Sequence, residues 1–173
     1  ALAHLHEASK LARQWQLAAV EARSQRALYR VLVGKGELSK AMLALQQALH
    51  HYQQLGYHLH KGFVYRSLGY VAWLQGNYAQ ALTYYEQCLA VYQEADDQPR
   101  VVSIWPHLGE IHDVLHDLGR AYYYYDLAYR HLEESQDRRH AANTIGGFAR
   151  LMARLGDYDK AHQYGQQALA EQR

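Results

Sequence analysis

The sequence predicts an all-α solenoid of antiparallel helix pairs, and three observations lead to this prediction. The first is a register of forty residues that runs along the whole 173-residue chain. The second is the spacing of apolar residues inside each unit, which follows the period of an amphipathic helix. The third is composition, with two prolines in the chain and no alternating run typical of a strand. A repeat of this size indicates stacked two-helix units rather than one globular core.

Small residues mark the register most clearly. Alanine recurs every forty residues, at Ala1, Ala41, Ala81, Ala121 and Ala161. Seven residues further on, the chain has Ala8, Ala48, Cys88, Ala128 and Ala168. We expect these small side chains to lie where two helices cross, because small residues let helices approach closely.

Residues 62–95 form the clearest copy of the unit. Its first half carries Val64, Leu68, Val71 and Ala72 at helical spacing, and Gly76 then ends that helix. Its second half repeats the pattern at Tyr78, Ala81, Leu82, Tyr85, Cys88, Leu89 and Tyr92. The unit is therefore predicted to be a helical hairpin.

The period then places every helix in order. An unpaired second helix covers residues 1–14, and the pairs follow at 17–34 and 37–54, 57–75 and 78–95, 98–116 and 118–135, and 138–155 and 158–172. As domains, this is one array over 1–173, with four full repeats at 17–54, 57–95, 98–135 and 138–172. Residue 1 is not Met and lies inside a unit, so we expect a segment of a larger protein.

Three places test the helix assignment. Pro99 falls at a helix start, where a missing N–H costs little. Pro106 either kinks the helix that begins near residue 98 or shows that this helix begins late, near Ser103. Gly146 and Gly147 lie inside a predicted helix, where each glycine costs about 1 kcal/mol.

Several columns together resemble the tetratricopeptide repeat. The best match is Tyr65, Leu68, Gly69, Gly76, Tyr78, Ala81, Tyr85 and Cys88. The turn glycine recurs at Gly36 and Gly156, with His116 as the exception. The period of forty exceeds the usual thirty-four or so, and the helix-ending proline of the family is replaced by Gln53, Gln93 and Glu133. The resemblance implies a right-handed superhelix of the long-period type found in bacterial signalling and transcription-regulator proteins.

The resemblance also implies that the first helix of each pair lines a concave groove. The residues it places there are Arg23, Arg26, Arg30, Phe63, Arg66, Tyr70, Trp73, His107, Glu110, Asp113, Asn143, Arg150 and Arg154. Such a groove has cations and aromatic rings at one end and a small acidic patch in its middle. The implied ligand is a protein or peptide segment with acidic and apolar residues. The alternative is that these side chains only keep a solenoid face hydrated.

Composition limits the other classes of function. The formal net charge of +1 is unlike that of a bulk nucleic-acid binder, so no nucleic-acid partner is expected for this segment. No apolar run is long enough for a membrane span, and no membrane partner is expected. The single cysteine, Cys88, lies in a small-residue column and is expected to be buried. One cysteine excludes an internal disulfide framework and fits a cytoplasmic location.

The enzyme alternatives are weaker. His112 and His116 stand four apart with Asp113 between them, as in a zinc-hydrolase helix, but the acid is Asp and no third ligand is evident. The sequence has no glycine-rich phosphate loop and no recognisable nucleophile–base set. We therefore expect no enzymatic activity, no cofactor and no metal.

Two hypotheses of different kinds remain beside the remote metal-dependent hydrolase. The first is a protein- or peptide-binding scaffold or sensor module of a multidomain bacterial signalling or transcription regulator. The second is a self-association module, forming homo-oligomers through end faces or tyrosine-rich convex helices.

Overall fold

The computed structural model describes residues 2–14, 17–135 and 141–171, which form nine α-helices and no strand. The chain divides into two compact units, Ala1–Asp96 and Asp97–Arg173. The predicted all-α class is confirmed. Among the helices described, none combines the length and the apolar character needed to cross a bilayer.

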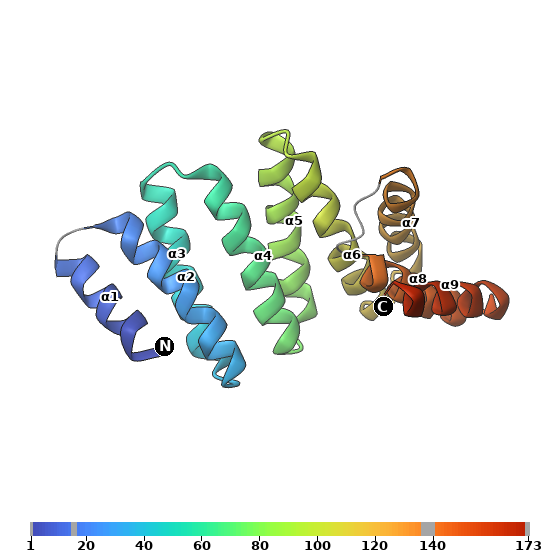
Figure 1. Cartoon of the computed structure of the whole chain (residues 1–173), viewed down its shortest axis with the longest axis horizontal. Coiled ribbons are helices and arrows are strands. Elements are labelled where there is room, and N and C mark those ends of the chain that lie inside the picture. The colour runs from blue at the N-terminus through green and yellow to red at the C-terminus, as the bar shows by residue number, and fades with distance from the viewer. Residues whose placement is uncertain (1, 15–16, 136–140, 172–173) are drawn as a thin grey trace. The chain divides into compact units, whose positions relative to one another are not determined.

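The first unit is built of helical hairpins. Its helices are α1 (Leu2–Gln14), α2 (Ala18–Gly34), α3 (Leu38–Gln54), α4 (His58–Leu74) and α5 (Tyr78–Glu94). Helices α2 and α3 pack against each other, as do α4 and α5, while α1 packs on α2 and α3 packs on α4 (Figure 1). The predicted helix positions are confirmed to within about one residue at each end.

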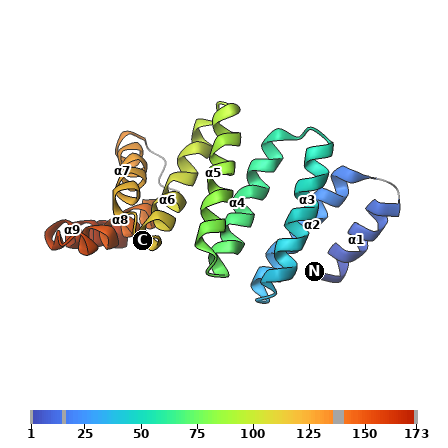
Figure 2. The same cartoon turned by 180° about the vertical axis from the view of Figure 1, so that it is seen from behind.

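The second unit has the same local design. Its helices are α6 (Gln98–Val114), α7 (Leu118–Glu134), α8 (Ala141–Arg154) and α9 (Tyr158–Ala170). Helix α6 packs on α7, α7 on α8 and α8 on α9, and α6 also touches α8 (Figure 2). The predicted start of α8, near residue 138, lies outside the described residues.

The turn inside each hairpin repeats one backbone conformation. Gly36, Gly76 and Gly156 have φ angles of 75°, 74° and 83°, and His116 takes the same left-handed conformation with a φ of 64°. Glycine adopts this conformation without strain, whereas a residue with a Cβ atom does so at a cost. His116 therefore differs from the other turns in residue type but has the same turn geometry.

Short polar side chains begin several helices. Asn77, Asp97, Asp117 and Asp157 each accept a hydrogen bond from the backbone N–H three residues further on. A side-chain cap of this kind satisfies a backbone donor that the first helical turn leaves without a partner. The repeat thus fixes both ends of a hairpin, with a left-handed residue that ends one helix and a cap that begins the next.

Helix α6 runs without interruption from Gln98 to Val114 and contains Pro106. The late start near Ser103 is therefore wrong. Asp97 caps the helix and Pro99 lies in its first turn, and both features favour initiation at this point. Pro106 has no N–H to donate to the carbonyl group of Val102, so α6 lacks one internal hydrogen bond there.

Tyrosine rings pack on glycine backbone at the crossings between helices. A Cβ atom added to Gly69 would lie 2.9 Å from the ring of Tyr85, and one added to Gly109 would lie 3.0 Å from the ring of Tyr125. Both rings are fully buried. Glycine at these two crossings thus provides the space that the aromatic ring of the neighbouring helix occupies.

Cys88 is buried, as expected from its column. Its thiol donates to the carbonyl oxygen of Gly62 at 3.1 Å. Burial raises the pKa of the Cys88 thiol to about 12, so the group is protonated and unreactive at neutral pH.

Candidate functional site

Helices α2 and α4 of the first unit enclose a hollow of about 1130 Å³, which we call the arginine hollow. Its lining residues are Arg23, Arg26, Ala27, Tyr29, Arg30, Val31, His60, Phe63, Arg66 and Ser67. Five of the predicted groove residues, namely Arg23, Arg26, Arg30, Phe63 and Arg66, are therefore brought together in one place.

The spacing of the arginines explains why they share the hollow. Arg23, Arg26 and Arg30 are three and four residues apart on α2, so their side chains project from one face of that helix. Phe63 and Arg66 are likewise three apart on α4. The hollow is thus formed by the matching faces of two successive first helices.

Two guanidinium groups lie near the ring of Phe63. The Arg26 carbon Cζ is 5.6 Å from the ring centroid of Phe63, and the Arg66 carbon Cζ is 6.0 Å from it. Cation–π contacts of this length are worth about 0.5–1 kcal/mol at exposed sites. They place two guanidinium groups beside an apolar ring.

The charge of the hollow is uncompensated. Four of its lining residues are arginines and none is acidic. Across residues 2–14, 17–135 and 141–171, no ion pair joins a carboxylate to Arg23, Arg26, Arg30 or Arg66. Arginine stays protonated at any ordinary pH, so the hollow carries several positive charges that an anionic ligand can neutralise.

The positive charge of the arginine hollow affects the pKa values of His60 and Tyr52. Burial, and then the positive charges of Arg26 and Arg23, hold the pKa of His60 below its usual value. Burial raises the pKa of the Tyr52 hydroxyl, against the opposing effect of the same two arginines. The rings of Tyr52 and His60 lie 5.0 Å apart, and the buried Tyr52 hydroxyl has no hydrogen-bond partner among the described residues. His60 was missed in the sequence, although it lies three residues before Phe63 on the same helix face.

Tyr70 and Trp73 do not line the arginine hollow. They lie further along α4, where their rings stack at a centroid distance of 6.3 Å and an interplanar angle of 11°. Tyr70 is exposed, while the indole N–H of Trp73 is buried and has no hydrogen-bond partner in the part of the chain that the structure describes. This aromatic pair presents an apolar surface on the first helix that also carries Arg66.

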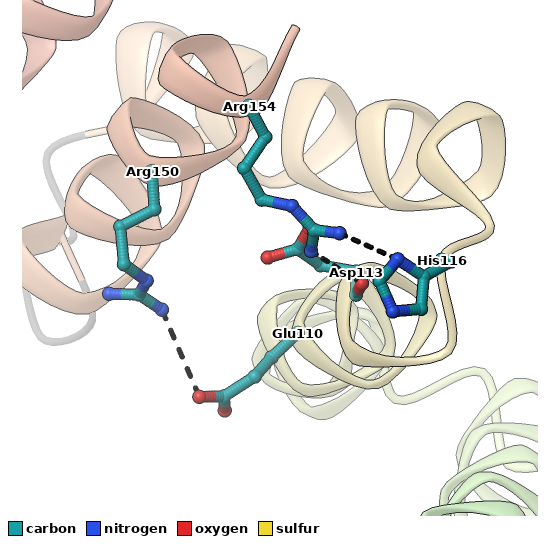
Figure 3. Close-up of polar contacts among 5 residues, drawn as sticks. All are labelled: Glu110, Asp113, His116, Arg150 and Arg154. Carbon is teal, nitrogen blue, oxygen red and sulfur yellow. Dashed lines mark hydrogen bonds and ion pairs between the residues drawn. The ribbon is translucent and has the colours of Figure 1, made fainter.

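The predicted groove residues of the second unit face one another instead. The Arg150 atom Nη2 lies 3.8 Å from Glu110 Oε1, which links α8 to α6 (Figure 3). Burial raises the pKa of the Glu110 carboxyl, with Arg150 opposing this and Asp113 adding to it. Asn143 is exposed and His107 is partly buried on the same two helices.

Arg154 of α8 contacts two residues, one at the end of α6 and one in the turn that follows it. Its Nη1 donates to the backbone oxygen of Asp113 at 2.7 Å and also to the Asp113 carboxylate. Its Nη2 lies 2.9 Å from Nδ1 of His116. Figure 3 shows the guanidinium group of Arg154 lying over the end of α6. Arg154 and Asp113 therefore satisfy each other and tie two first helices together.

The two histidines of the metal alternative have separate surroundings. His112 is buried, stacks on Tyr124 at 5.6 Å and has its Nδ1 3.6 Å from Asp117 Oδ2. His116 lies in the turn beside Arg154. Among the described residues, no three or more His, Cys, Asp or Glu side chains are grouped closely enough to hold a metal ion.

Helical hairpins with glycine-terminated turns, tyrosine-on-glycine crossings and a polar face on successive first helices define a helical-repeat protein. The sequence model of the tetratricopeptide repeat matches residues 44–94, and this part of the chain carries the tetratricopeptide repeat, as predicted. This match spans the second half of one hairpin and the whole of the next. No curated protein sequence matches the chain.

Solved structures of similar fold cover nearly the whole chain. BtubC (BKLC) from P. vanneervenii has a TM-score of 0.79 at 19% identity, covering 98% of this chain and 73% of its own. The TPR-like repeats of a putative kinesin light chain from Podosopora anserina have a TM-score of 0.73 at 16% identity, covering 99% and 95%. A Rap protein complexed with Competence and Sporulation Factor has a TM-score of 0.67 at 16% identity, covering 99% and 58%. These likenesses establish the fold.

Proposed function

We propose that the chain is a protein- or peptide-binding module whose arginine hollow takes a segment carrying acidic and apolar residues. The observation that carries this proposal is a lining with four arginines and no acidic residue, in which the guanidinium groups of Arg26 and Arg66 lie near the ring of Phe63. A repeat fold of this kind is generally a non-catalytic scaffold, which agrees with a binding role.

The chemistry of the hollow selects its ligand. A guanidinium group offers a fork of N–H donors that matches a carboxylate, and a hydrogen bond to a charged group contributes about 1.5–3 kcal/mol. The Phe63 ring and the stacked Tyr70 and Trp73 rings offer apolar contact along the same helix. A segment that alternates acidic and apolar residues can use both features at once.

The second unit supplies a more selective surface under this proposal. Its acidic groove residues Glu110 and Asp113 are already faced by Arg150 and Arg154, so this surface has little net charge to offer. The pair between Glu110 and Arg150 is long at 3.8 Å, and Arg150 is mostly exposed. An exposed pair of this kind is worth about 0–1 kcal/mol. A charged ligand group can therefore replace one partner of the Glu110–Arg150 pair at a small cost in free energy.

The wider setting is part of the same proposal. We infer that the segment is the sensor or scaffold part of a larger bacterial signalling or transcription regulator in the cytoplasm. Support comes from the Rap protein of similar fold, which was crystallised with Competence and Sporulation Factor and of which this chain spans 58%. The buried, protonated thiol of Cys88 agrees with a reducing compartment.

A fluorescent peptide of alternating Glu and Leu residues tests the hollow by anisotropy. We expect saturable binding that weakens at least about tenfold in the double variant Arg26→Gln with Arg66→Gln, because two charged hydrogen-bond donors are removed. Arg120→Gln, at an exposed arginine of α7, is the matched control and should bind as the unmodified chain does.

The specificity arm uses two competitors. The same peptide with Gln in place of Glu should compete poorly, and so should single-stranded RNA of equal charge. Equal competition by the RNA would reduce the hollow to a general anion site and contradict the proposal. Retained affinity in the double variant would remove the hollow from the function.

Self-association is the second candidate, because the second unit exposes several aromatic side chains. Tyr122 and Tyr123 of α7 and Tyr158 of α9 are 44%, 58% and 73% exposed. Sedimentation velocity over a hundredfold range of concentration separates the candidates. A monomer throughout would exclude this role, whereas a dimer that dissociates when Tyr123 and Tyr158 are changed to Ser would support it.

A further inference from the structure

A second pocket lies between helices α1, α2 and α3 of the first unit, and the arginine hollow shares none of its lining residues. Its volume is about 560 Å³, within the range of roughly 300–1,000 Å³ typical of small-molecule sites. Its walls include the apolar side chains Leu2, Leu28, Leu32, Leu43 and Ala44. We call it the α1–α3 pocket.

The pocket exists because three residues break the repeat. Ser9, Gln25 and Ala44 line it, one on each of the three helices. Forty residues further on, the positions are occupied by Leu49, Tyr65 and Tyr84, which pack against the core of the same unit. The two phenol rings and the isobutyl group fill the space that smaller side chains leave open in the first joint.

The joint between α7, α8 and α9 repeats the filled arrangement. There the same three positions are Tyr129, Ile145 and Tyr164, which pack together around one core cluster. The rings of Tyr129 and Tyr164 lie 5.2 Å apart. The open pocket is thus a departure from a packing rule that holds at two other joints of the molecule.

The floor of the pocket is polar, because its lining residues Ser9 and Gln25 belong to a buried hydrogen-bond network with Glu21, which lies behind them. The Ser9 hydroxyl donates to Glu21 Oε1 at 2.6 Å, and Gln25 Nε2 donates to the same oxygen at 2.8 Å and to Ser9 Oγ at 3.0 Å. All three side chains are at most 5% exposed. Burying three polar groups is costly unless they are satisfied, so the network is a specific feature of this joint.

This network determines whether the floor offers hydrogen-bond donors or acceptors to a ligand. Both amide protons of Gln25 and the hydroxyl proton of Ser9 are directed to partners within it. Gln25 is left with its carbonyl oxygen, which is a hydrogen-bond acceptor. A ligand atom that reaches the floor is therefore matched if it is a donor, such as a hydroxyl or an N–H group.

The mouth of the pocket, unlike the floor, favours an anionic group. Lys10, Lys40 and His6 line the mouth together with one acidic residue, Glu37, which pairs with Lys40 at 2.6 Å. Lys10 is exposed and has no carboxylate partner among the described residues. The mouth is therefore net positive and complements an anionic group at the outer end of a ligand.

From these features we propose that the α1–α3 pocket binds a small apolar organic acid that carries a hydroxyl or N–H group at the end remote from its carboxylate. The apolar body lies against Leu28, Leu32 and Leu43. The donor meets the Gln25 carbonyl oxygen, and the carboxylate lies between Lys10 and Lys40. The site is independent of the proposed peptide-binding role.

A hydroxynaphthoic acid whose hydroxyl and carboxyl groups stand at opposite ends of the fused rings is a suitable fluorescent probe. We expect saturable binding by the purified chain, about three- to tenfold weaker for naphthoic acid, which lacks the hydroxyl group. Changing Lys10 and Lys40 to Gln should weaken binding roughly two- to fivefold.

Ala44→Tyr closes the pocket with the residue that the next joint already uses, and it should abolish probe binding. Ala90→Tyr places the same residue at an exposed site of α5 and should leave binding unchanged, as should Arg26→Gln with Arg66→Gln. Circular dichroism checks that the variants keep their helices, and Ser9→Leu provides a second closure if Ala44→Tyr does not fold.

Three results would overturn the site. They are the absence of saturable binding below about 1 mM, undiminished binding by a folded closure variant, and equal binding of the hydroxynaphthoic acid, naphthoic acid and naphthol. The last result would show that the probe senses only apolar surface.

Discussion

A Cβ atom added to Gly147 would lie 2.5 Å from Cε1 of Tyr125, closer than carbon atoms can pack. The ring of Tyr125, from α7, is fully buried and rests on bare backbone of α8 at this point. The neighbouring Gly146 is different, because its added Cβ would meet nothing closer than the Cβ atom of Ala168 at 3.9 Å. Packing against Tyr125 thus requires glycine at position 147, whereas the space around Gly146 would accept a Cβ atom.

This difference predicts opposite effects of two alanine substitutions. Gly147→Ala should lower the free energy of unfolding by about 1–3 kcal/mol, since overpacking against a buried ring outweighs the gain in helix propensity. Gly146→Ala should raise it by up to about 1 kcal/mol. Urea unfolding followed by circular dichroism measures both. Stabilisation by Gly147→Ala would show that Tyr125 can move aside.

The contacts of Arg154 predict a larger loss than those of its neighbour on α8. Arg154→Gln leaves the buried Asp113 carboxylate without its partner and should cost about 1–3 kcal/mol of stability. Arg150→Gln, at a long and exposed pair, should change stability by less than about 0.5 kcal/mol. Thermal unfolding of the two variants checks the order, and equal losses would contradict it.

The raised pKa of Glu110 predicts how its replacement depends on pH. Because burial raises this pKa in the folded chain, the folded state binds the proton more tightly than the unfolded state does. The stability that the proton provides is complete below about pH 4.5, the ordinary value, and is lost as the pH rises through the folded pKa. Glu110→Gln should therefore match the unmodified chain at low pH and exceed it at neutral pH. Denaturant midpoints at several pH values test this, and a gain confined to acid would have the wrong sign.

His60 predicts a direct readout of the charge in the arginine hollow. The pKa of its ring is held down by burial and by Arg26 and Arg23, so Arg26→Gln should raise it towards the usual value. An acidic peptide bound in the hollow should raise it as well. NMR titration of the imidazole protons measures both shifts. Arg154→Gln, in the other unit, is the control and should leave the pKa of His60 unchanged.

Much of the fold follows from the sequence because each hairpin repeats the same local signals. The apolar period and the turn glycines were enough to place the described helices to within a residue or two. Pro106 shows the limit of such reasoning. One proline allows either a kink or a late start, and the choice depended on the Asp97 cap, which lies nine residues earlier in the chain.

The candidate site could be predicted less completely. The residues of α2 and α4 were found because side-chain spacing on a helix gives a common face. The pairing of Arg154 with Asp113 and His116 could not be found, since it depends on how α8 is placed against α6. The Ser9, Glu21 and Gln25 network had a detectable signal, which is polar residues in columns that are mostly apolar in the later units.

His116 shows what such a mismatch can do. A left-handed backbone costs a non-glycine residue roughly 1–2 kcal/mol, yet the chain keeps an imidazole at this turn and places it against Arg154. An engineer who smoothed the array towards a uniform consensus would install glycine there. The hairpin would close more easily, but it would lose a tether to the next one. A residue that departs from the repeat pattern can thus give one hairpin a contact that the other hairpins lack.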